Sequence, residues 1–353
     1  MLLIDFSHLC HRYIFTCISK AKVKKENGIY KTEDYIGLLY HGILTNLIYL
    51  KGKFSNYGSV VLCCEGKNSW RKQFYPEYKA SRIKDSTIDF ETLYKHLDEF
   101  TQSLKDYFGV YVLKFDGAEG DDVIATIAND IETNHIIVSS DKDFKQLLRL
   151  ENVKIFDPMK KEFLTYETFN DIENVLKEHI ICGDSSDNIP NVLAKEKFTP
   201  EFLSFLRTND LFVETPREFF KLKCADSILE KYDVYETYKS GKNKGKQKET
   251  KAVFQKVTLT KSKIEEIKKR LESNEDPWLK ECYEFNEKLI DFRLIPFEIR
   301  QRIINGFNDT ELKNPEPMEI MNFCLKHRLT DILKTIQVFY TKTEDKINDF
   351  KEW

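Results

Sequence analysis

The chain has 353 residues, of which 41% are hydrophobic and 32% are charged, an ordinary globular composition with ample material for a core. Its formal net charge of −3 is the balance of 55 basic and 58 acidic side chains, so the total says little about partners if the two signs are clustered. No apolar run reaches the ~18 residues of a membrane span, and MLLIDFSHLC has no positive leader region, so we expect neither a membrane association nor a signal peptide.

The first 160 residues alternate short apolar runs with longer segments of helical spacing. The predicted strands are 2–5, 59–64, 110–115, 135–140 and 153–157, and the predicted helices between them are 34–50, 89–108 and 120–131. Continuous apolar strands separated by helices are typical of a parallel sheet that is covered on both faces. We therefore predict an α/β domain over residues 1–165, with a parallel central sheet flanked by helices.

From about residue 166 the pattern becomes mostly helical. The predicted helices are 166–181, 200–207, 216–231, 261–273, 296–306 and 317–338. We predict a helical C-terminal domain over 166–340, followed by a tail at 341–353. Within that domain, the lysine-rich stretch KSGKNKGKQKETK (239–251) has no apolar residue, which indicates a mobile loop that is either a solvated linker or a nucleic-acid contact.

Acidic residues follow four successive predicted strands. Asp5 ends the first strand and Glu65 follows the second; Glu119, Asp121 and Asp122 come after the third, and Asp141 and Asp143 come after the fourth. In an open parallel sheet, the ligand site lies beyond the carboxyl ends of the strands. Each acid could instead cap a helix or lie in a turn, but capping needs one acid per helix, whereas this layout crowds many carboxylates into one crevice.

Such crowding is unfavourable unless cations neutralise it. The candidate ligands at the strand ends include no histidine, and the eight cysteines form no C-x-x-C pair, so carboxylate oxygens would select hard divalent ions. We expect two Mg²⁺ ions, with Mn²⁺ as a substitute, which together support phosphodiester hydrolysis. The stretch ICGDSSDNIPNV (181–192) carries Asp184 and Asp187, which either belong to a plain solvated turn or supply the last ligands of the second ion.

Residues 67–84, KNSWRKQFYPEYKASRIK, interleave basic and aromatic side chains. Basic groups contact phosphates and aromatic faces stack on bases, a combination that is expected for single-stranded nucleic acid. The alternative is an amphipathic surface helix whose aromatic side chains reach the core. The candidate nucleic-acid-binding residues here are Lys67, Trp70, Arg71, Lys72, Tyr75 and Tyr78.

Five stretches together resemble a known family. LLIDFSHL, YPEYKASR, AEGDDVIATIA, VSSDKDF and GDSSDNIPNV match, in order and spacing, the motifs of the 5′-nucleases, which include flap endonucleases and the 5′-exonuclease domain of bacterial DNA polymerase I. The resemblance extends to the T-even phage ribonuclease H branch through KLIDFRLIPFEIRQRIINGF (288–307). It implies a 5′-to-3′ exonuclease and 5′-flap endonuclease that acts on DNA 5′ flaps, 5′ ends and RNA–DNA hybrids, and removes RNA primers during replication in the cytoplasm of a phage's host.

The resemblance also implies roles for individual residues. The first metal group would be Asp5, Glu65, Glu119, Asp121 and Asp122, and the second would be Asp141, Asp143, Asp184 and Asp187. Lys79 and Arg82 match the basic positions of YKxxR, with which the family contacts the scissile phosphate from a helical arch. Here the arch would span about residues 66–100.

The sequence departs from the family at three places. Cys63-Cys64-Glu65 stands where most members end the second strand in Asp, so Glu65 would be shifted by one residue or would act with a longer arm. The family's Gly-rich helix–turn–helix, which grips duplex DNA, is replaced by LAKEKFTPEF, so we expect Lys195, Lys197 and the 239–251 loop to contact the duplex. The stretch 208–262 has no clear counterpart.

Partners and rival functions complete the expectations. The tail TKTEDKINDFKEW (341–353) would either dock on a sliding clamp or single-strand-binding protein, or pack on its own domain. We expect a monomer. The rival functions are a compact ribonuclease of toxin or RNA-processing type and an inactive nucleic-acid-binding scaffold. The basic aromatic segment argues against the first, and the retained acid set argues against the second.

Overall fold

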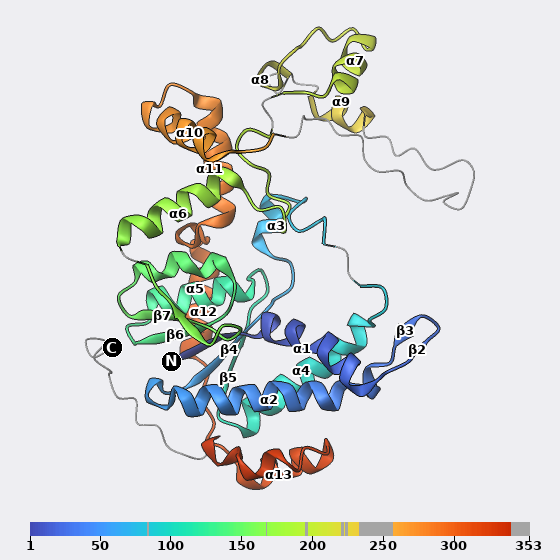
Figure 1. The fold of residues 1–353 in the computed structure, drawn as a ribbon, viewed down its shortest axis with the longest axis vertical. Coiled ribbons are helices and arrows are strands. Elements are labelled where there is room, and N and C mark those ends of the chain that lie inside the picture. The colour runs from blue at the N-terminus through green and yellow to red at the C-terminus, as the bar shows by residue number, and fades with distance from the viewer. Residues whose placement is uncertain are drawn as a thin grey trace. The chain divides into compact units, whose positions relative to one another are not determined.

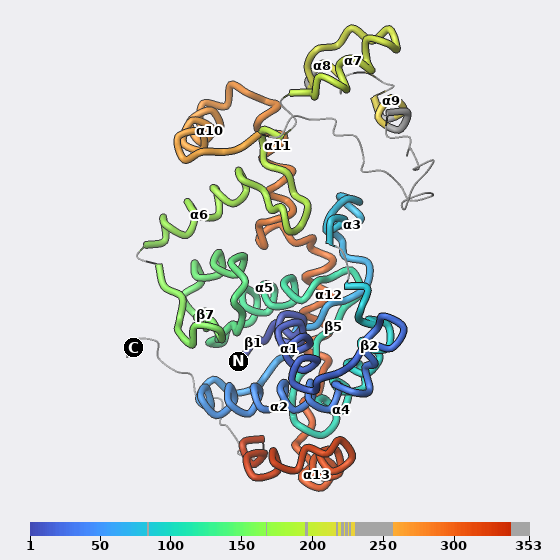
Figure 2. Tube along the Cα trace, turned by 45° about the vertical axis from the view of Figure 1, so that its right-hand side comes forward, coloured from blue at the N-terminus to red at the C-terminus, as the bar shows by residue number. Residues whose placement is uncertain are grey.

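The computed structural model of the chain describes residues 1–82, 85–166, 168–194, 197–219, 222, 225–232 and 257–339. The expectations for Lys195, for the loop 239–251 and for the tail 341–353 therefore lie outside the described residues. The chain forms two compact units (Figures 1 and 2). The first comprises Met1–Leu176 and Asp291–Trp353, and the second comprises Lys177–Ile290.

The first unit contains a mixed, mostly parallel sheet with the strand order β5-β4-β1-β6-β7-β8. Its strands are β1 (Leu2–Asp5), β4 (Val60–Cys64), β5 (Tyr111–Lys114), β6 (His135–Val138), β7 (Val153–Asp157) and β8 (Glu162–Leu164). Neighbouring strands from β5 to β7 pair in parallel, and β8 pairs antiparallel with β7. The predicted parallel sheet is confirmed, and the antiparallel edge strand β8 is an addition to it.

Helices cover both faces of this sheet (Figure 1). The side chains of Leu2 and Ile4 pack into one core with residues of α1, α2, α4 and α13, whereas Leu3 packs into the opposite core with residues of α5 and α12. Because both faces are buried, the strands read as continuous apolar runs. The helices of this unit are α1 (Phe6–Ala21), α2 (Ile36–Lys53), α3 (Trp70–Phe74), α4 (Phe90–Tyr107), α5 (Gly120–Asp130), α12 (Phe297–Asn308) and α13 (Pro317–Lys326).

The short hairpin β2 (Lys25–Glu26) and β3 (Ile29–Tyr30) and the helix α1 were not predicted from the sequence. Helix α1 buries Leu9, Cys10, Ile14, Cys17 and Ile18, which follow helical spacing. It begins directly after β1, because the Asp5 carboxylate accepts a hydrogen bond from the His8 N–H at 2.9 Å and so caps the helix.

The second unit is helical. The boundary between the units falls within α6 (Phe169–Cys182), and the other helices are α7 (Pro200–Thr208), α8 (Pro216–Phe219), α9 (Ala225–Tyr232), α10 (Lys261–Ser273) and α11 (Pro277–Ile290). One of its cores joins the 181–193 turn to α10 and α11 through Ile181, Val192, Ile267 and Leu279. Another core, around Phe198, Phe202 and Phe219, joins α7 to α8.

The compact units differ from the predicted consecutive domains 1–165 and 166–340. The reason is the apolar faces of the last helices: Ile299 and Ile303 of α12 pack in the core beside α5, and Ile320 and Phe323 of α13 pack in the core beside α4. Helix α11 was not predicted, and the predicted helix 317–338 ends at Lys326. Among the described residues, no helix is both long and apolar enough to cross a bilayer.

Candidate metal centre

In the first unit, several of the predicted acids lie at the carboxyl edge of the sheet. Strands β4, β1 and β6 are neighbours, and at their carboxyl ends stand Glu65, Asp5 and Asp141. Asp121, near the start of α5, interacts with the same group: burial raises the pKa of Asp121 well above its usual range, and the charges of Asp5, Glu119 and Asp141 raise it further. Burial likewise raises the pKa of Asp5. This edge of the sheet thus concentrates negative charge, as a site for cations requires.

Glu65 faces the N-terminus of α5, where it accepts a hydrogen bond from the Gly120 N–H at 3.3 Å. Although its side chain reaches solvent, the surrounding protein and the charge of Glu119 raise the pKa of Glu65 to about 7. Cys63 and Cys64 are buried in opposite cores, so neither thiol lies at the sheet edge. Glu65 is therefore the acid that this strand contributes.

Ser139 links two of the acids, and the sequence analysis missed it. Its hydroxyl donates to Asp5 Oδ2 at 3.3 Å and accepts from the Asp141 N–H at 3.1 Å. Asp141 in turn caps a 3₁₀ helix (Lys142–Arg149) by accepting from the Asp143 N–H at 2.9 Å. The side chain of Ser139 is fully buried, and its position directly after an apolar strand was the available signal.

Glu119 and Asp122 form a reciprocal cap at the start of α5. The Glu119 N–H donates to Asp122 Oδ2 at 2.9 Å, and the Trp70 indole donates to the same oxygen at 3.1 Å. Arg71 donates to Asp122 Oδ1 at 2.7 Å, and Asp122 has no exposed surface. Both oxygens of Asp122 are thus engaged within the protein and its side chain is buried, which favours a structural role over the metal-ligand role that was expected.

Trp70, Arg71 and Tyr78, which were expected to contact nucleic acid, are buried in this structure. Their exposed fractions are 6%, 2% and 3%. Arg71 donates to Glu119 Oε2 at 3.1 Å, and the Tyr78 hydroxyl donates to that same oxygen at 2.9 Å. Arg71 also lies 4.6 Å from the centroid of the Trp70 ring. The alternative reading of this segment, in which its aromatic residues reach the core, applies to Trp70 and Tyr78.

Backbone hydrogen bonds fix the start of this segment to the strand-to-helix turn before α5. Gly66 N–H donates to the Ala118 carbonyl at 3.0 Å, and Trp70 N–H donates to the Gly117 carbonyl at 2.9 Å. A Cβ on Gly66 would lie 1.8 Å from the Phe115 carbonyl oxygen, so this approach requires glycine. Trp70 and Arg71 are thereby held against the acidic start of α5.

Lys79, the first of the two predicted catalytic cations, lies beside Glu119. Its ammonium donates to Glu119 Oε1 at 2.7 Å, and its side chain is 15% exposed. Its backbone is left-handed, with a φ of 58°, which is uncommon for a residue with a Cβ. The remaining candidates of the segment are more accessible: Tyr75 is half-buried, and Lys67, Lys72 and Arg82 are exposed.

The turn at 181–192 belongs to the second unit and is closed by its own hydrogen bonds. Asp184 and Ile189 exchange backbone hydrogen bonds of 2.9 and 2.7 Å, and Gly183 has a φ of 67°. The Asp184 carboxylate, which is 5% exposed, accepts from the Ser186 N–H at 2.8 Å and from its hydroxyl at 2.6 Å. The ordinary turn interpretation thus holds for the backbone of this stretch.

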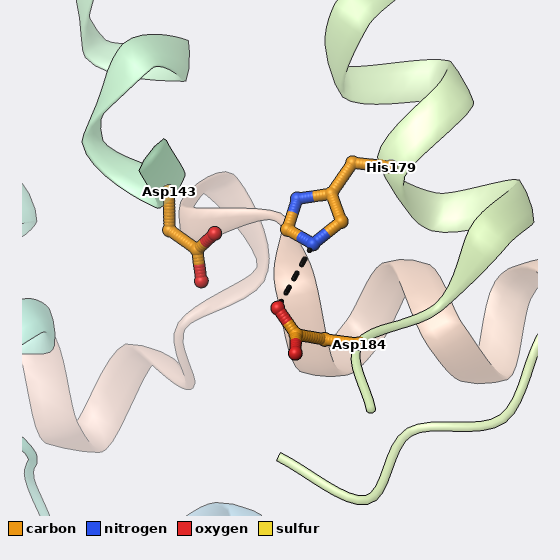
Figure 3. Close-up of side chains that lie close together, drawn as sticks. All are labelled: Asp143, His179 and Asp184. Carbon is orange, nitrogen blue, oxygen red and sulfur yellow. Dashed lines mark hydrogen bonds and ion pairs between the residues drawn. The ribbon is translucent and has the colours of Figure 1, made fainter. Parts of the chain in front are cut away.

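His179 is a second residue that the sequence analysis missed. Its Nε2 lies 3.3 Å from Asp184 Oδ2. Figure 3 shows the His179 ring facing the Asp184 carboxylate. A histidine that orients a carboxylate is a common accompaniment of metal sites. Asp187 is half-buried in the same turn, and Lys197, the described lysine of the expected duplex contact, is exposed.

Comparisons with known proteins agree with the motifs. Residues 1–177 match the family described as "5′-3′ exonuclease, N-terminal resolvase-like domain", and residues 221–339 match "T4 RNase H, C terminal". The second match overlaps the stretch 208–262, for which the motifs gave no counterpart.

Individual proteins are similar over different lengths. The ribonuclease H of Enterobacteria phage T4 is 27% identical over 348 residues, which cover 96% of this chain and 95% of that protein. The flap endonuclease Xni of Pseudoalteromonas translucida is 30% identical over 142 residues, covering 36% of this chain and 51% of that protein. Among solved structures, the T5 D15 protein co-crystallised with metal ions has a TM-score of 0.48 at 15% identity and covers 88% of this chain and 98% of that one.

Proposed function

The chain belongs to the 5′-3′ exonuclease family and is a metal-dependent 5′-nuclease, and from this premise we propose that it removes RNA primers and displaced 5′ strands during DNA replication. The observation that carries the proposal is the cluster of Asp5, Glu119, Asp121 and Asp141 at one sheet edge, where burial and mutual repulsion raise the pKa of Asp121. Repulsion between neighbouring carboxylates is relieved when bound cations neutralise their charges, so this cluster favours a metal site.

The donor set fits hard divalent ions, because it consists of carboxylate oxygens. The first ion would be held by Asp5, Glu65, Glu119 and Asp121, all of the first unit. On the resemblance of their motifs, we assign Asp141, Asp143, Asp184 and Asp187 to the second ion. Two bound Mg²⁺ ions, for which Mn²⁺ would substitute, would supply an activated water and stabilise the attacking and leaving oxygens of the phosphodiester.

The chain's own cations act on the substrate. Lys79, which lies at the acids, would bind the scissile phosphate and stabilise the negative charge that develops on it. Arg82, which is exposed, would contact the same phosphate and stabilise the same developing charge. We propose that residues from about 66 to 100 form the arch beneath which a 5′ strand passes. Lys67 and Lys72, which are exposed, would contact the phosphates of that strand.

The proposed substrates rest on the similar proteins, and the proposed duplex contact rests on the lysines of the C-terminal part of the chain. A ribonuclease H and a flap endonuclease are among the similar proteins, so we propose DNA 5′ flaps, DNA 5′ ends and RNA–DNA hybrids as substrates. Lys197, together with Lys195 and the 239–251 lysines outside the described residues, would contact the duplex. A sliding clamp or single-strand-binding protein remains our proposed partner for the tail, and the active form would be a monomer in the cytoplasm.

The test is cleavage of a 5′-flap DNA in Mg²⁺ by the natural chain beside the Asp141→Asn variant. Asparagine keeps the shape and an acceptor oxygen for the Asp143 N–H but removes a charged ligand atom. We expect the natural chain to release the flap, and the variant to bind the flap and leave it whole. If the natural chain binds the flap but fails to cut it in both Mg²⁺ and Mn²⁺, the inactive-scaffold function replaces the nuclease.

A further inference from the structure

Arg71 is a buried cation beside the acids, and it and Lys79 contact different oxygens of Glu119. Its guanidinium donates to Glu119 Oε2 at 3.1 Å and to Asp122 Oδ1 at 2.7 Å. The Tyr78 hydroxyl donates to the same Oε2 at 2.9 Å. The other oxygen, Oε1, accepts from Lys79 at 2.7 Å. Glu119 is therefore held on one side by buried donors and on the other side by the more accessible Lys79.

The two cations are built differently. The Arg71 side chain is 3% exposed and stacks on Trp70. Its backbone segment is held in place by the hydrogen bonds that Gly66 and Trp70 donate to the turn before α5. The Lys79 side chain is 15% exposed and extends from a turn with a left-handed backbone. A buried, stacked guanidinium is a rigid support, whereas an ammonium on a four-carbon stem can move away.

From this asymmetry we propose that Arg71 is a positioning residue, which holds Oε2 of Glu119 so that Oε1 is the oxygen presented to a divalent ion. Asp122 completes the support, because it anchors the same guanidinium and caps α5. Lys79 contacts Oε1 in this structure, and its ammonium would become available to a phosphate if Oε1 held an ion instead. The inference rests on the proposed function, since it deepens the role of the same acids.

A simple counter-ion role makes the opposite prediction for Arg71. Removing a positive charge beside an acidic site should strengthen the binding of any cation, because a like charge has been taken away. Removing a positioning group should weaken binding, and the loss of such an outer partner typically costs about 10–100-fold in metal affinity. Lys79 provides the matched control, since it also bears one positive charge at hydrogen-bond distance from Glu119.

The experiment is calorimetric titration of Mg²⁺, without DNA, into the natural chain and the variants Arg71→Met and Lys79→Met. We expect Arg71→Met to bind Mg²⁺ about tenfold more weakly. Lys79→Met should bind Mg²⁺ severalfold more tightly and yet lose flap cleavage. Tighter binding by both variants would overturn the proposal and leave Arg71 as a counter-ion.

Two further measurements separate this outcome from misfolding and from failure of the proposed function. Thermal unfolding in EDTA identifies a temperature at which each variant is folded. If Arg71→Met has none, Arg71→Lys decides: it keeps the charge but not the planar guanidinium, so weaker Mg²⁺ binding supports positioning, and unchanged or tighter binding overturns it. If the natural chain itself binds neither Mg²⁺ nor Mn²⁺, the proposed function fails, whatever the variants do.

Discussion

Breaking the Arg71–Asp122 ion pair should destabilise the first unit strongly. Asp122 has no exposed surface and Arg71 is 2% exposed, so replacement of Arg71 by Met leaves a carboxylate that water cannot reach. The Trp70 indole and the Glu119 N–H would still donate to Asp122, but neither carries a compensating charge. Removing one partner of a buried pair typically costs about 3–5 kcal/mol.

The measurement is the free energy of unfolding in urea with EDTA present, together with the melting temperature. For a unit of this size, a loss of about 3–5 kcal/mol lowers the melting temperature by roughly 6–20 °C. The double variant Arg71→Met/Asp122→Asn should recover part of the loss, because Asn keeps acceptor oxygen for the indole or the N–H without the buried charge. We expect a coupling of roughly 1–3 kcal/mol between the two positions.

Two outcomes would refute this reasoning. A loss of less than about 1 kcal/mol for Arg71→Met would mean that Asp122 is neutral or solvated after the substitution. Additive effects of the two substitutions would mean that the close contact between Arg71 and Asp122 contributes no coupling energy. Either result would also remove the structural role that we assign to Asp122.

Two predictions concern sites away from the acids. Burial lowers the pKa of His135 from 6.5 to about 4, so the stability associated with its neutral form is complete above pH 6.5 and is lost as the pH falls towards 4, by up to about 3 kcal/mol. The unfolding free energy of His135→Gln should fall less steeply than that of the natural chain over this range, and equal slopes would contradict the assignment. In the second unit, Asn286 donates to the carbonyls of Ile180 and Pro190 at 2.9 and 2.7 Å. Asn286→Ala should cost about 1–3 kcal/mol and speed amide exchange in the 181–192 turn, whereas unchanged exchange would show that the turn needs no such support.

The central sheet was predictable because its physical signal is local. Each strand is a short apolar run, and burial on both faces makes that run continuous in the sequence. The acids at the strand ends were predictable for a related reason: parallel strands bring their carboxyl ends to one edge, so Asp5, Glu65 and Asp141 were expected to lie near one another before any contact was known. Helix α1 had the same kind of signal in its buried spacing, although it was not predicted.

The roles of individual residues in the site were not predictable, because they depend on contacts between segments that are distant in the sequence. The sequence pattern of this segment does not show which basic side chains are buried. Arg71 is buried against two carboxylates, whereas its neighbour Lys72 is exposed. Which neighbour turns inward depends on the hydrogen bonds of Gly66 and Trp70 to the turn before α5, a contact between segments about 50 residues apart. The same contact brings Trp70 and Arg71 to both oxygens of Asp122, although its sequence motif suggests a metal ligand.

By itself, the sequence determined the α/β class, the acidic sheet edge and the membership of the 5′-3′ exonuclease family, because apolar periodicity and ordered motifs are written along the chain. The tertiary structure alone decided that α12 and α13 join the first unit and that Arg71, Tyr78 and Lys79 share the oxygens of Glu119. Such partnerships join side chains that are distant in the sequence, and their geometry exists only once the backbone has folded.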